Sequence, residues 1–137
     1  MIVDDDAMFG KIAEVAFKSD DTDVDVTLDG AAALRRLRDL RYDLIIVDLE
    51  MPGMDGFSLI RNIRRERGYE TTDIIVITGR KDLGAIDLSY QLGAVSFVTK
   101  PVNWRLLPHK VKSVLATRAP LGAPHQHASS LTSKRDM

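Results

Sequence analysis

The sequence contains no cysteine, which excludes a disulfide framework and any thiolate chemistry. No stretch approaches the ~18 apolar residues of a membrane-spanning helix. Acidic and basic residues nearly balance, at 20 against 19, so no overall field favours a nucleic acid or a membrane surface as partner. The N-terminus turns acidic at Asp4 and lacks the pattern of a signal peptide. We therefore expect a protein of a reducing, cytoplasmic compartment.

The chain of 137 residues is long enough to bury a core and short enough to form one domain. Its character changes at Ala119, after which most residues are small or polar and no apolar period remains. We expect residues 1–118 to form the domain, and 119–137 to be a flexible tail or a linker to an effector domain. His125 and His127 lie in this tail, where a lone His-x-His pair is a weak metal signal.

Short apolar segments alternate with amphipathic ones along the first 118 residues. Unbroken or alternating apolar runs predict strands, and a 3.6-residue apolar period behind an Asp or Asn predicts a helix. The expected strands are 1–3, 24–28, 44–47, 74–77 and 96–99. The expected helices are 7–18, 30–40, 57–67, 83–92 and 103–118. We expect Ile12 and Leu28 to face the core. The alternation predicts an α/β domain with a parallel sheet covered by helices on both faces.

Reactive side chains follow four of the five expected strands. They are Asp4 and Asp5, Asp48, Thr78, and Lys100. Because ligands of an open parallel sheet bind beyond the carboxyl ends of its strands, these side chains should share one rim. Clustered carboxylates repel one another, and an all-oxygen set with room for water suits Mg²⁺. A cation beside a lysine and a hydroxyl can bind a phosphoryl group, whose phosphorus a carboxylate can attack in line.

Each of these residues also has a plainer interpretation. An acid after a strand is often a turn residue or a helix cap, and we expect Asp6 to cap the first helix. Thr78 before Gly79 is compatible with simple turn chemistry, and Lys100 with a surface position. Their joint placement at successive strand ends favours a functional site.

Four segments resemble the receiver domain of two-component response regulators, in order and at the expected spacing. They are VDDD at 3–6, DLIIVDLEMPGMDG at 43–56, IIVITG at 74–79 and GAVSFVTKPV at 93–102. The resemblance covers about residues 1–118. It implies a doubly wound, flavodoxin-like (βα)5 fold with strand order 2-1-3-4-5. It also implies a bacterial, cytoplasmic signalling switch rather than a turnover enzyme, one that catalyses its own phosphorylation and dephosphorylation.

The resemblance assigns roles to the acidic residues. Asp48 would accept a phosphoryl group from the phosphohistidine of a sensor histidine kinase or a phosphotransfer protein. Asp5 and Asp48 would bind Mg²⁺ directly, together with the backbone carbonyl of Glu50. Asp4 would act through metal-bound water. The buried strand before Asp48 would hold its carboxylate in position for attack.

The remaining site residues also take their roles from the resemblance. Lys100 would pair with a phosphoryl oxygen, and its bond to Pro101 would be cis. Thr78 would move to hydrogen-bond the phosphoryl group, and Phe97 would turn inward with it; an ordinary core aromatic is the alternative for Phe97. The switch would change the face made by the last two strand–helix units. That face would bind a second copy, giving a homodimer, or control an attached effector.

Two positions beside the site carry opposite charges. Glu50 lies two residues after Asp48, and Arg80 lies two residues after Thr78. Because an arginine fork matches a carboxylate, we expect the pair to bridge over Asp48 and slow the loss of the phosphoryl group. The alternative is two solvated charges with little coupling.

Two features depart from the common family pattern. Only three residues precede Asp4, whereas a strand usually has ~5–6, so either the first strand is short or residues before Met1 are missing. The stretch KPVNWRLLPHKVKSVL resembles receivers attached to cyclic-di-GMP synthases or phosphodiesterases.

Two other functions compete with a phosphorylated receiver. A haloacid dehalogenase-like aspartyl-phosphate phosphatase uses an Asp-x-Asp pair after its first strand, whereas this chain has Asp48-x-Glu50 after its third. A protein-binding receiver that is never phosphorylated has no need of the intact acids, Thr78 and Lys100. We expect no direct nucleic-acid binding by this domain. A dinucleotide-binding role is also not expected, because no G-x-G-x-x-G follows a strand.

Overall fold

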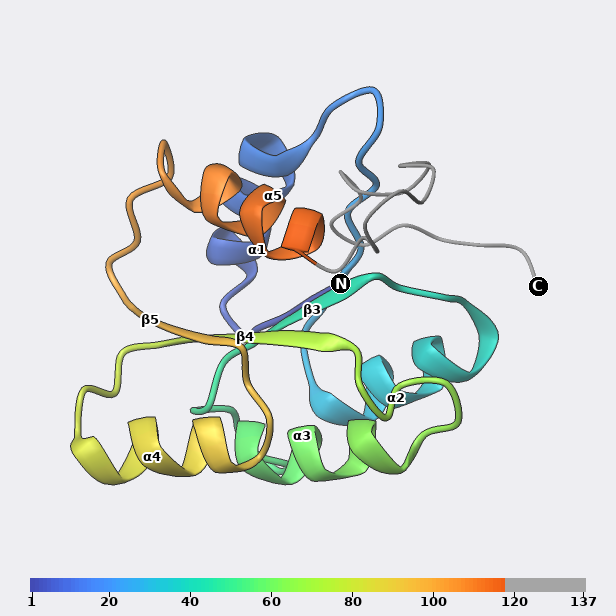
Figure 1. The fold of residues 1–137 in the computed structure, drawn as a ribbon, viewed down its shortest axis with the longest axis vertical. Helices are drawn as coiled ribbons and strands as arrows, with labels where there is room; N and C mark the ends of the chain where they lie inside the picture. The colour runs from blue at the N-terminus through green and yellow to red at the C-terminus, as the bar shows by residue number, and fades with distance from the viewer. Residues whose placement is uncertain (118–137) are drawn as a thin grey trace.

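A five-stranded parallel sheet runs through the middle of the molecule, in the order β2-β1-β3-β4-β5 (Figure 1). The strands are β1 Ile2–Val3, β2 Val26–Thr27, β3 Leu44–Val47, β4 Asp73–Thr78 and β5 Ser96–Thr99. The helices are α1 Ala7–Phe17, α2 Gly30–Asp39, α3 Gly56–Arg65, α4 Leu83–Gln91 and α5 Leu107–Thr117. The computed structural model describes residues 1–117, so the expected tail at 119–137, with His125 and His127, lies outside the described residues. The predicted fold class and strand order are confirmed.

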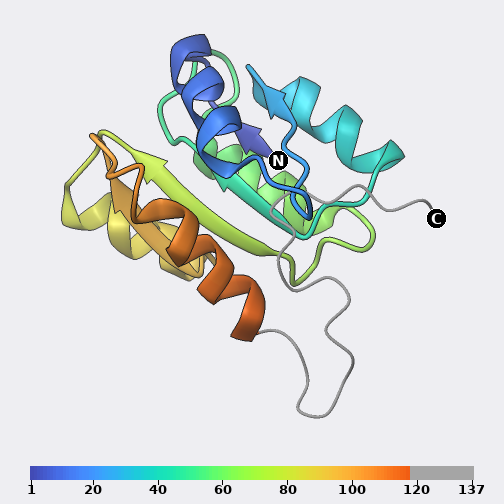
Figure 2. The ribbon, with the colours of Figure 1, turned by 90° about the horizontal axis from the view of Figure 1, so that it is seen from above.

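Helices cover both faces of the sheet. Figures 1 and 2 show α1 and α5 on one face and α2, α3 and α4 on the other. The central strand β3 is buried along its whole length, with Ile45 and Val47 in the core under α2 to α4 and Leu44 and Ile46 in the core under α1 and α5. A continuous apolar run is what a strand with two covered faces requires. The pattern therefore fixes β3, and with it the position of Asp48 at its end.

The first strand has only two residues, yet neighbours pair with it on both sides. Ile2 lies between Val26 and Ile46, and Val3 lies between Thr27 and Val47. The amide N–H of Ile46 donates to the carbonyl of Met1 at 2.8 Å. These two residues of β1 deliver Asp4 to the middle of the sheet.

The last helix begins later than expected. Asn103 accepts hydrogen bonds at its side-chain oxygen from the N–H groups of Arg105 and Leu106, at 3.0 and 3.3 Å, and so caps a turn. α5 itself begins at Leu107. The cause is Pro108, which has no N–H to donate to the carbonyl four residues earlier.

Two side chains expected in the core are exposed. Ile12 is 41 % exposed, because the inner face of α1 runs through Phe9 and Ala13. Leu28 is 50 % exposed, because β2 ends one residue before it. In both cases the apolar pattern identified the element, and the expectation failed on which positions face inward.

Candidate functional site

Three carboxylates meet at the carboxyl ends of two adjacent strands. Asp4 follows β1, Asp48 follows β3, and Asp5 lies beside them. One oxygen from each lies within 4.8 Å of the others. Asp4 and Asp48 are 1 % and 6 % exposed, whereas Asp5 is exposed to solvent. The structure therefore brings the predicted acids together, with two of them at the bottom of the site and one at its edge.

Lys100 lies between the two buried carboxylates. Its Nζ donates to Asp4 Oδ2 at 2.7 Å and to Asp48 Oδ2 at 3.0 Å. Its amide N–H donates to the carbonyl of Thr78 at 2.8 Å, which holds its backbone beside the end of β4. The bond from Lys100 to Pro101 is cis. The alternative of a surface lysine before a proline does not fit these contacts. An ammonium and a carboxylate nucleophile are thus held within hydrogen-bonding distance of each other.

The two partners of this ion pair have shifted pKa values. Burial raises the pKa of Asp4, and the hydrogen bond from Lys100 offsets this only in part. Burial alone lowers the pKa of Lys100, but its hydrogen bonds to Asp4 and Asp48 outweigh burial and raise it. Lys100 therefore remains an ammonium ion at neutral pH. Three carboxylates against one ammonium leave the rim negative, which favours a cation.

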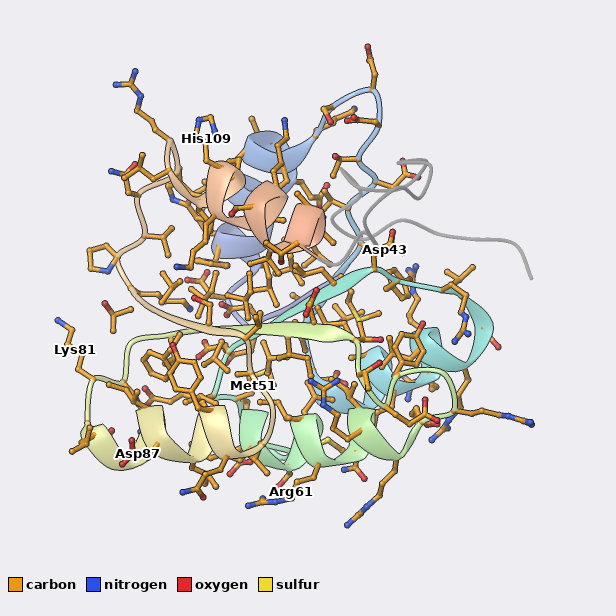
Figure 3. The ribbon with its side chains drawn as sticks, in the orientation of Figure 1. Asp43, Met51, Arg61, Lys81, Asp87 and His109 are labelled. Atoms are coloured by element: carbon orange, nitrogen blue, oxygen red, sulfur yellow. The ribbon has the colours of Figure 1, made fainter. Side chains whose placement is uncertain are left out.

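The loop after Asp48 is shaped to hold that carboxylate. Asp48 Oδ1 accepts the N–H of Glu50 at 3.2 Å, so both carboxylate oxygens have a donor. Gly53 turns the chain at a φ of +78°, which favours glycine. A Cβ on Gly56 would overlap the backbone of Asp48 and Leu49, so only glycine lets α3 begin this close to the site. Figure 3 shows Met51 of the same loop directed into the interior.

Thr78 ends the strand next to β3. Because Val47 pairs with Val76, Thr78 lies two residues further along, level with the loop that follows Asp48. It is fully buried, and its hydroxyl oxygen accepts the N–H of Arg80 at 3.4 Å. Phe97 lies on β5, partly buried against the core under α2 to α4. It also lines a surface cavity together with side chains from the β5–α5 segment.

The expected bridge between Glu50 and Arg80 is wrong in this structure. Arg80 instead pairs with Asp82, through Nε to Oδ1 at 3.0 Å and Nη2 to Oδ2 at 2.9 Å. Its guanidinium also lies 5.7 Å from the ring centroid of Phe57. Pairing with a residue two positions away in the same loop costs less conformational entropy than pairing with a residue that follows another strand. The Asp82 hydrogen bond is the main cause of the raised pKa of Arg80, and Glu50 contributes only through its more distant charge.

Sequence reasoning missed one residue of the site. Phe9 of α1 places its ring under the Lys100 ammonium, with Nζ 4.4 Å from the ring centroid. Phe9 also contacts Trp104, at 5.0 Å between ring centroids. The apolar period assigned Phe9 to the core, where it does lie. No signal in the sequence distinguishes a core aromatic from one that also contacts a lysine 91 positions later.

Within residues 1–117, no helix combines the length and apolar character needed to cross a bilayer.

A protein-family model described as the response regulator receiver domain matches residues 1–112. Among curated proteins, the DNA-binding response regulator MtrA of Mycolicibacterium paratuberculosis is 31 % identical over 115 residues, which cover 84 % of this chain and 50 % of that protein. A protein-glutamate methylesterase/protein-glutamine glutaminase of Geobacter sulfurreducens is 36 % identical over 106 residues, 75 % of this chain and 28 % of that protein. The chain thus spans about half or less of the length of these two relatives.

Solved structures share the fold closely. The chemotaxis protein CheY4 of Vibrio cholerae superposes with a TM-score of 0.78 at 26 % identity, covering 82 % of this chain and 94 % of that one. A response regulator receiver protein from Pseudomonas putida gives a TM-score of 0.76 at 30 % identity, covering 82 % of this chain and 93 % of that one.

Proposed function

Because this chain belongs to the response regulator receiver domain family, we propose that Asp48 accepts a phosphoryl group from a sensor histidine kinase or a phosphotransfer protein. One observation carries the assignment to Asp48: it is the acid that ends the central strand β3, with Lys100 Nζ 3.0 Å away. The direct test is transfer of one phosphoryl group from a small phosphodonor to this residue. Such a protein is a switch of the cytoplasm that catalyses its own phosphorylation and dephosphorylation.

The chemistry follows from how Asp48 is held. One carboxylate oxygen attacks phosphorus while the bond from phosphorus to the donor imidazole breaks, and the imidazole leaves with the electron pair. The N–H of Glu50 and the Lys100 ammonium fix the orientation of the carboxylate before the donor arrives. The ammonium then neutralises charge on a phosphoryl oxygen. Because this hydrogen-bond donor is already in place, the protein does not have to reorganise during the transfer.

The acidic rim fits a divalent cation. All of its donors are oxygens, and the three carboxylates converge within 4.8 Å. We assign direct binding of Mg²⁺ to Asp5, Asp48 and the backbone carbonyl of Glu50, with Asp4 acting through metal-bound water. When bound, Mg²⁺ supplies positive charge to the phosphoryl oxygens.

Mg²⁺ is expected to stabilise the folded protein, because it relieves repulsion among the rim carboxylates. At a hundredfold excess over the dissociation constant, the free energy of unfolding should rise by about 2.7 kcal/mol. Urea denaturation with and without Mg²⁺ measures this gain. Asp5→Asn should lose most of it, whereas Asp20→Asn, which removes an exposed acid outside the rim, should keep it. Equal gains in the two variants would contradict the assignment of Asp5.

Output is proposed to pass through Thr78 and Phe97 to the face formed by α4, β5 and α5. Leu83 and Tyr90 of α4 are 71 % and 48 % exposed, and Leu106, in the turn before α5, is 62 % exposed. Exposed apolar side chains here are compatible with a surface that binds a partner. The partner we propose is a second copy of this face or an effector, for which a cyclic-di-GMP signalling domain is the candidate. Light scattering with and without beryllofluoride, a phosphoryl mimic, measures the association.

Glu50 and Arg80 are still proposed to set the lifetime of the phosphoryl group, but each acting alone. Arg80→Ala should lose phosphate severalfold faster if its side chain shields the group from water. Asp82→Ala frees Arg80 from its partner, so this variant should slow the loss. Dephosphorylation rates of these variants, of Glu50→Ala and of the Glu50/Arg80 double variant measure the effects. Independent action predicts additive changes in the barrier, and strong non-additivity would restore the bridge.

A further inference from the structure

Within residues 1–117, the Lys100 ammonium hydrogen-bonds to two carboxylates and also contacts an aromatic ring. Asp4 and Asp48 accept its hydrogen bonds, and the third contact is the face of the Phe9 ring, 4.4 Å from Nζ to centroid. The Lys100 side chain is 24 % exposed. An aromatic face attracts an ammonium through its quadrupole, and the attraction grows as water is excluded.

Phe9 is held rigidly in this position. Its backbone N–H donates to Asp6 Oδ1 at 3.3 Å, so the cap that starts α1 also fixes the first turn that carries the ring. The residue as a whole is 9 % exposed. The Phe9 ring also contacts Trp104, with the two ring planes inclined at 52° and the centroids 5.0 Å apart.

Trp104 comes from the same segment as Lys100. It lies four residues later, in the turn that Asn103 caps before α5 begins. Lys100 and Trp104 therefore both contact Phe9 from the β5–α5 segment, while Phe9 itself belongs to α1. The contact links the ammonium at the site to a loop that leads to the proposed output face.

The ring and the carboxylates interact with the ammonium in different ways. A carboxylate takes up one of the three N–H donors, whereas an aromatic face attracts the charge and leaves the donors to other acceptors. Phosphoryl oxygens can therefore bind the ammonium without displacing it from the ring. An aliphatic side chain of similar size would fill the space without this attraction.

We propose that Phe9 is a positioning residue for Lys100, holding the ammonium beside Asp48 while phosphoryl oxygens bind it, and that Trp104 supports the Phe9 ring. The inference rests on the proposed phosphorylation of Asp48. It adds a residue of α1 and a residue of the β5–α5 turn to the machinery of that reaction.

The kinetic test compares two phenylalanines of the same helix. Phe17 is also buried in the core under α1 and α5, and in residues 1–117 the aromatic ring that contacts Lys100 belongs to Phe9. Phosphorylation of Asp48 by acetyl phosphate is measured at saturating Mg²⁺ over a range of donor concentrations. Phe9→Leu should lower the maximal rate about threefold to tenfold. Phe9→Tyr, which keeps the ring, should restore the rate to within about twofold. Phe17→Leu should leave it unchanged.

The outcomes distinguish a failure of the proposed phosphorylation from a failure of the role of Phe9. Thermal unfolding first shows that each variant is folded, and Trp104→Leu serves as the second variant if Phe9→Leu is not. No labelling of the unsubstituted protein would overturn the proposed function itself. Normal labelling with equal rates for Phe9→Leu and Phe17→Leu would overturn only the role of Phe9. If Phe9→Tyr, which keeps the ring, were as slow as Phe9→Leu, the role of Phe9 would also be overturned.

A spectroscopic readout is available because Trp104 is the only tryptophan of the chain. Binding of beryllofluoride with Mg²⁺ gives Lys100 new fluoride partners in place of phosphoryl oxygens, so the surroundings of Phe9 and Trp104 should change. We expect a change in tryptophan emission in the unsubstituted protein and in Phe17→Leu, and its loss in Phe9→Leu. An emission change of the same size in Phe9→Leu would show that the signal does not pass through the ring.

Discussion

Incubation of the protein with Mg²⁺ and acetyl phosphate is expected to place one phosphoryl group on Asp48, and Asp48→Asn is expected to abolish this labelling. One oxygen of Asp48 bonds to phosphorus as the bond to the acetate oxygen breaks, and acetate leaves with the electron pair. The asparagine amide has the same shape but is a poor nucleophile. Intact-mass spectrometry counts the phosphoryl groups, and sensitivity to hydroxylamine identifies an acyl phosphate.

The control removes an acid from the same loop. Asp55 caps α3 by accepting the N–H of Ser58 at 2.8 Å, and it does not belong to the rim cluster. Asparagine is also a good N-cap, so Asp55→Asn should keep the fold and be labelled fully. Full labelling of Asp48→Asn would mean that another acid is the phosphoacceptor, and Asp4 would then be the first to test.

The position of the site was predictable because strand ends are predictable. The LIIV run of β3 is apolar on both faces, which fixes its place in the sheet and therefore that of Asp48. A fully buried strand lies directly before Asp48, so an error of one or two residues elsewhere does not move this residue. Lys100 follows the short apolar strand β5, which is less buried, since Phe97 and Val98 are half-buried and Thr99 is exposed.

Partners of exposed or flexible side chains were not predictable. The charges of three carboxylates, on Asp82, Glu50 and Asp55, act on Arg80, and its hydrogen bonds go to Asp82. The contact of Phe9 with Lys100 depends on how α1 docks against the end of β5, which no local pattern encodes. The late start of α5 was predictable from Pro108, because proline has no N–H for the helical hydrogen bond to the carbonyl four residues earlier.

Replacement of Lys100 by methionine is expected to cause a large loss of stability at neutral pH without Mg²⁺. Asp4 and Asp48 are nearly inaccessible to solvent, and their ammonium partner would be gone. Removing one partner of a buried ion pair costs about 3–5 kcal/mol, and because the Lys100 side chain is 24 % exposed we expect about 2–3 kcal/mol. Urea denaturation measures the loss. Lys81→Met is the matched control, since Lys81 follows the neighbouring strand β4 and projects away from the molecule (Figure 3).

The loss in Lys100→Met should shrink under two conditions that remove the unpaired negative charge. Mg²⁺ at neutral pH replaces the missing ammonium, so this variant should gain more stability from Mg²⁺ than the unsubstituted protein does. Acid acts through Asp4, whose pKa burial already raises and whose counteracting hydrogen bond from Lys100 is then absent. A carboxyl group with a raised pKa in the folded state takes up its proton more readily there than in the unfolded chain. The penalty is therefore full above the folded pKa and fades as the pH falls through it toward the ordinary value. A variant as stable as Lys81→Met at neutral pH, or a loss that neither Mg²⁺ nor acid reduces, would show that the ammonium of Lys100 does not compensate these carboxylates.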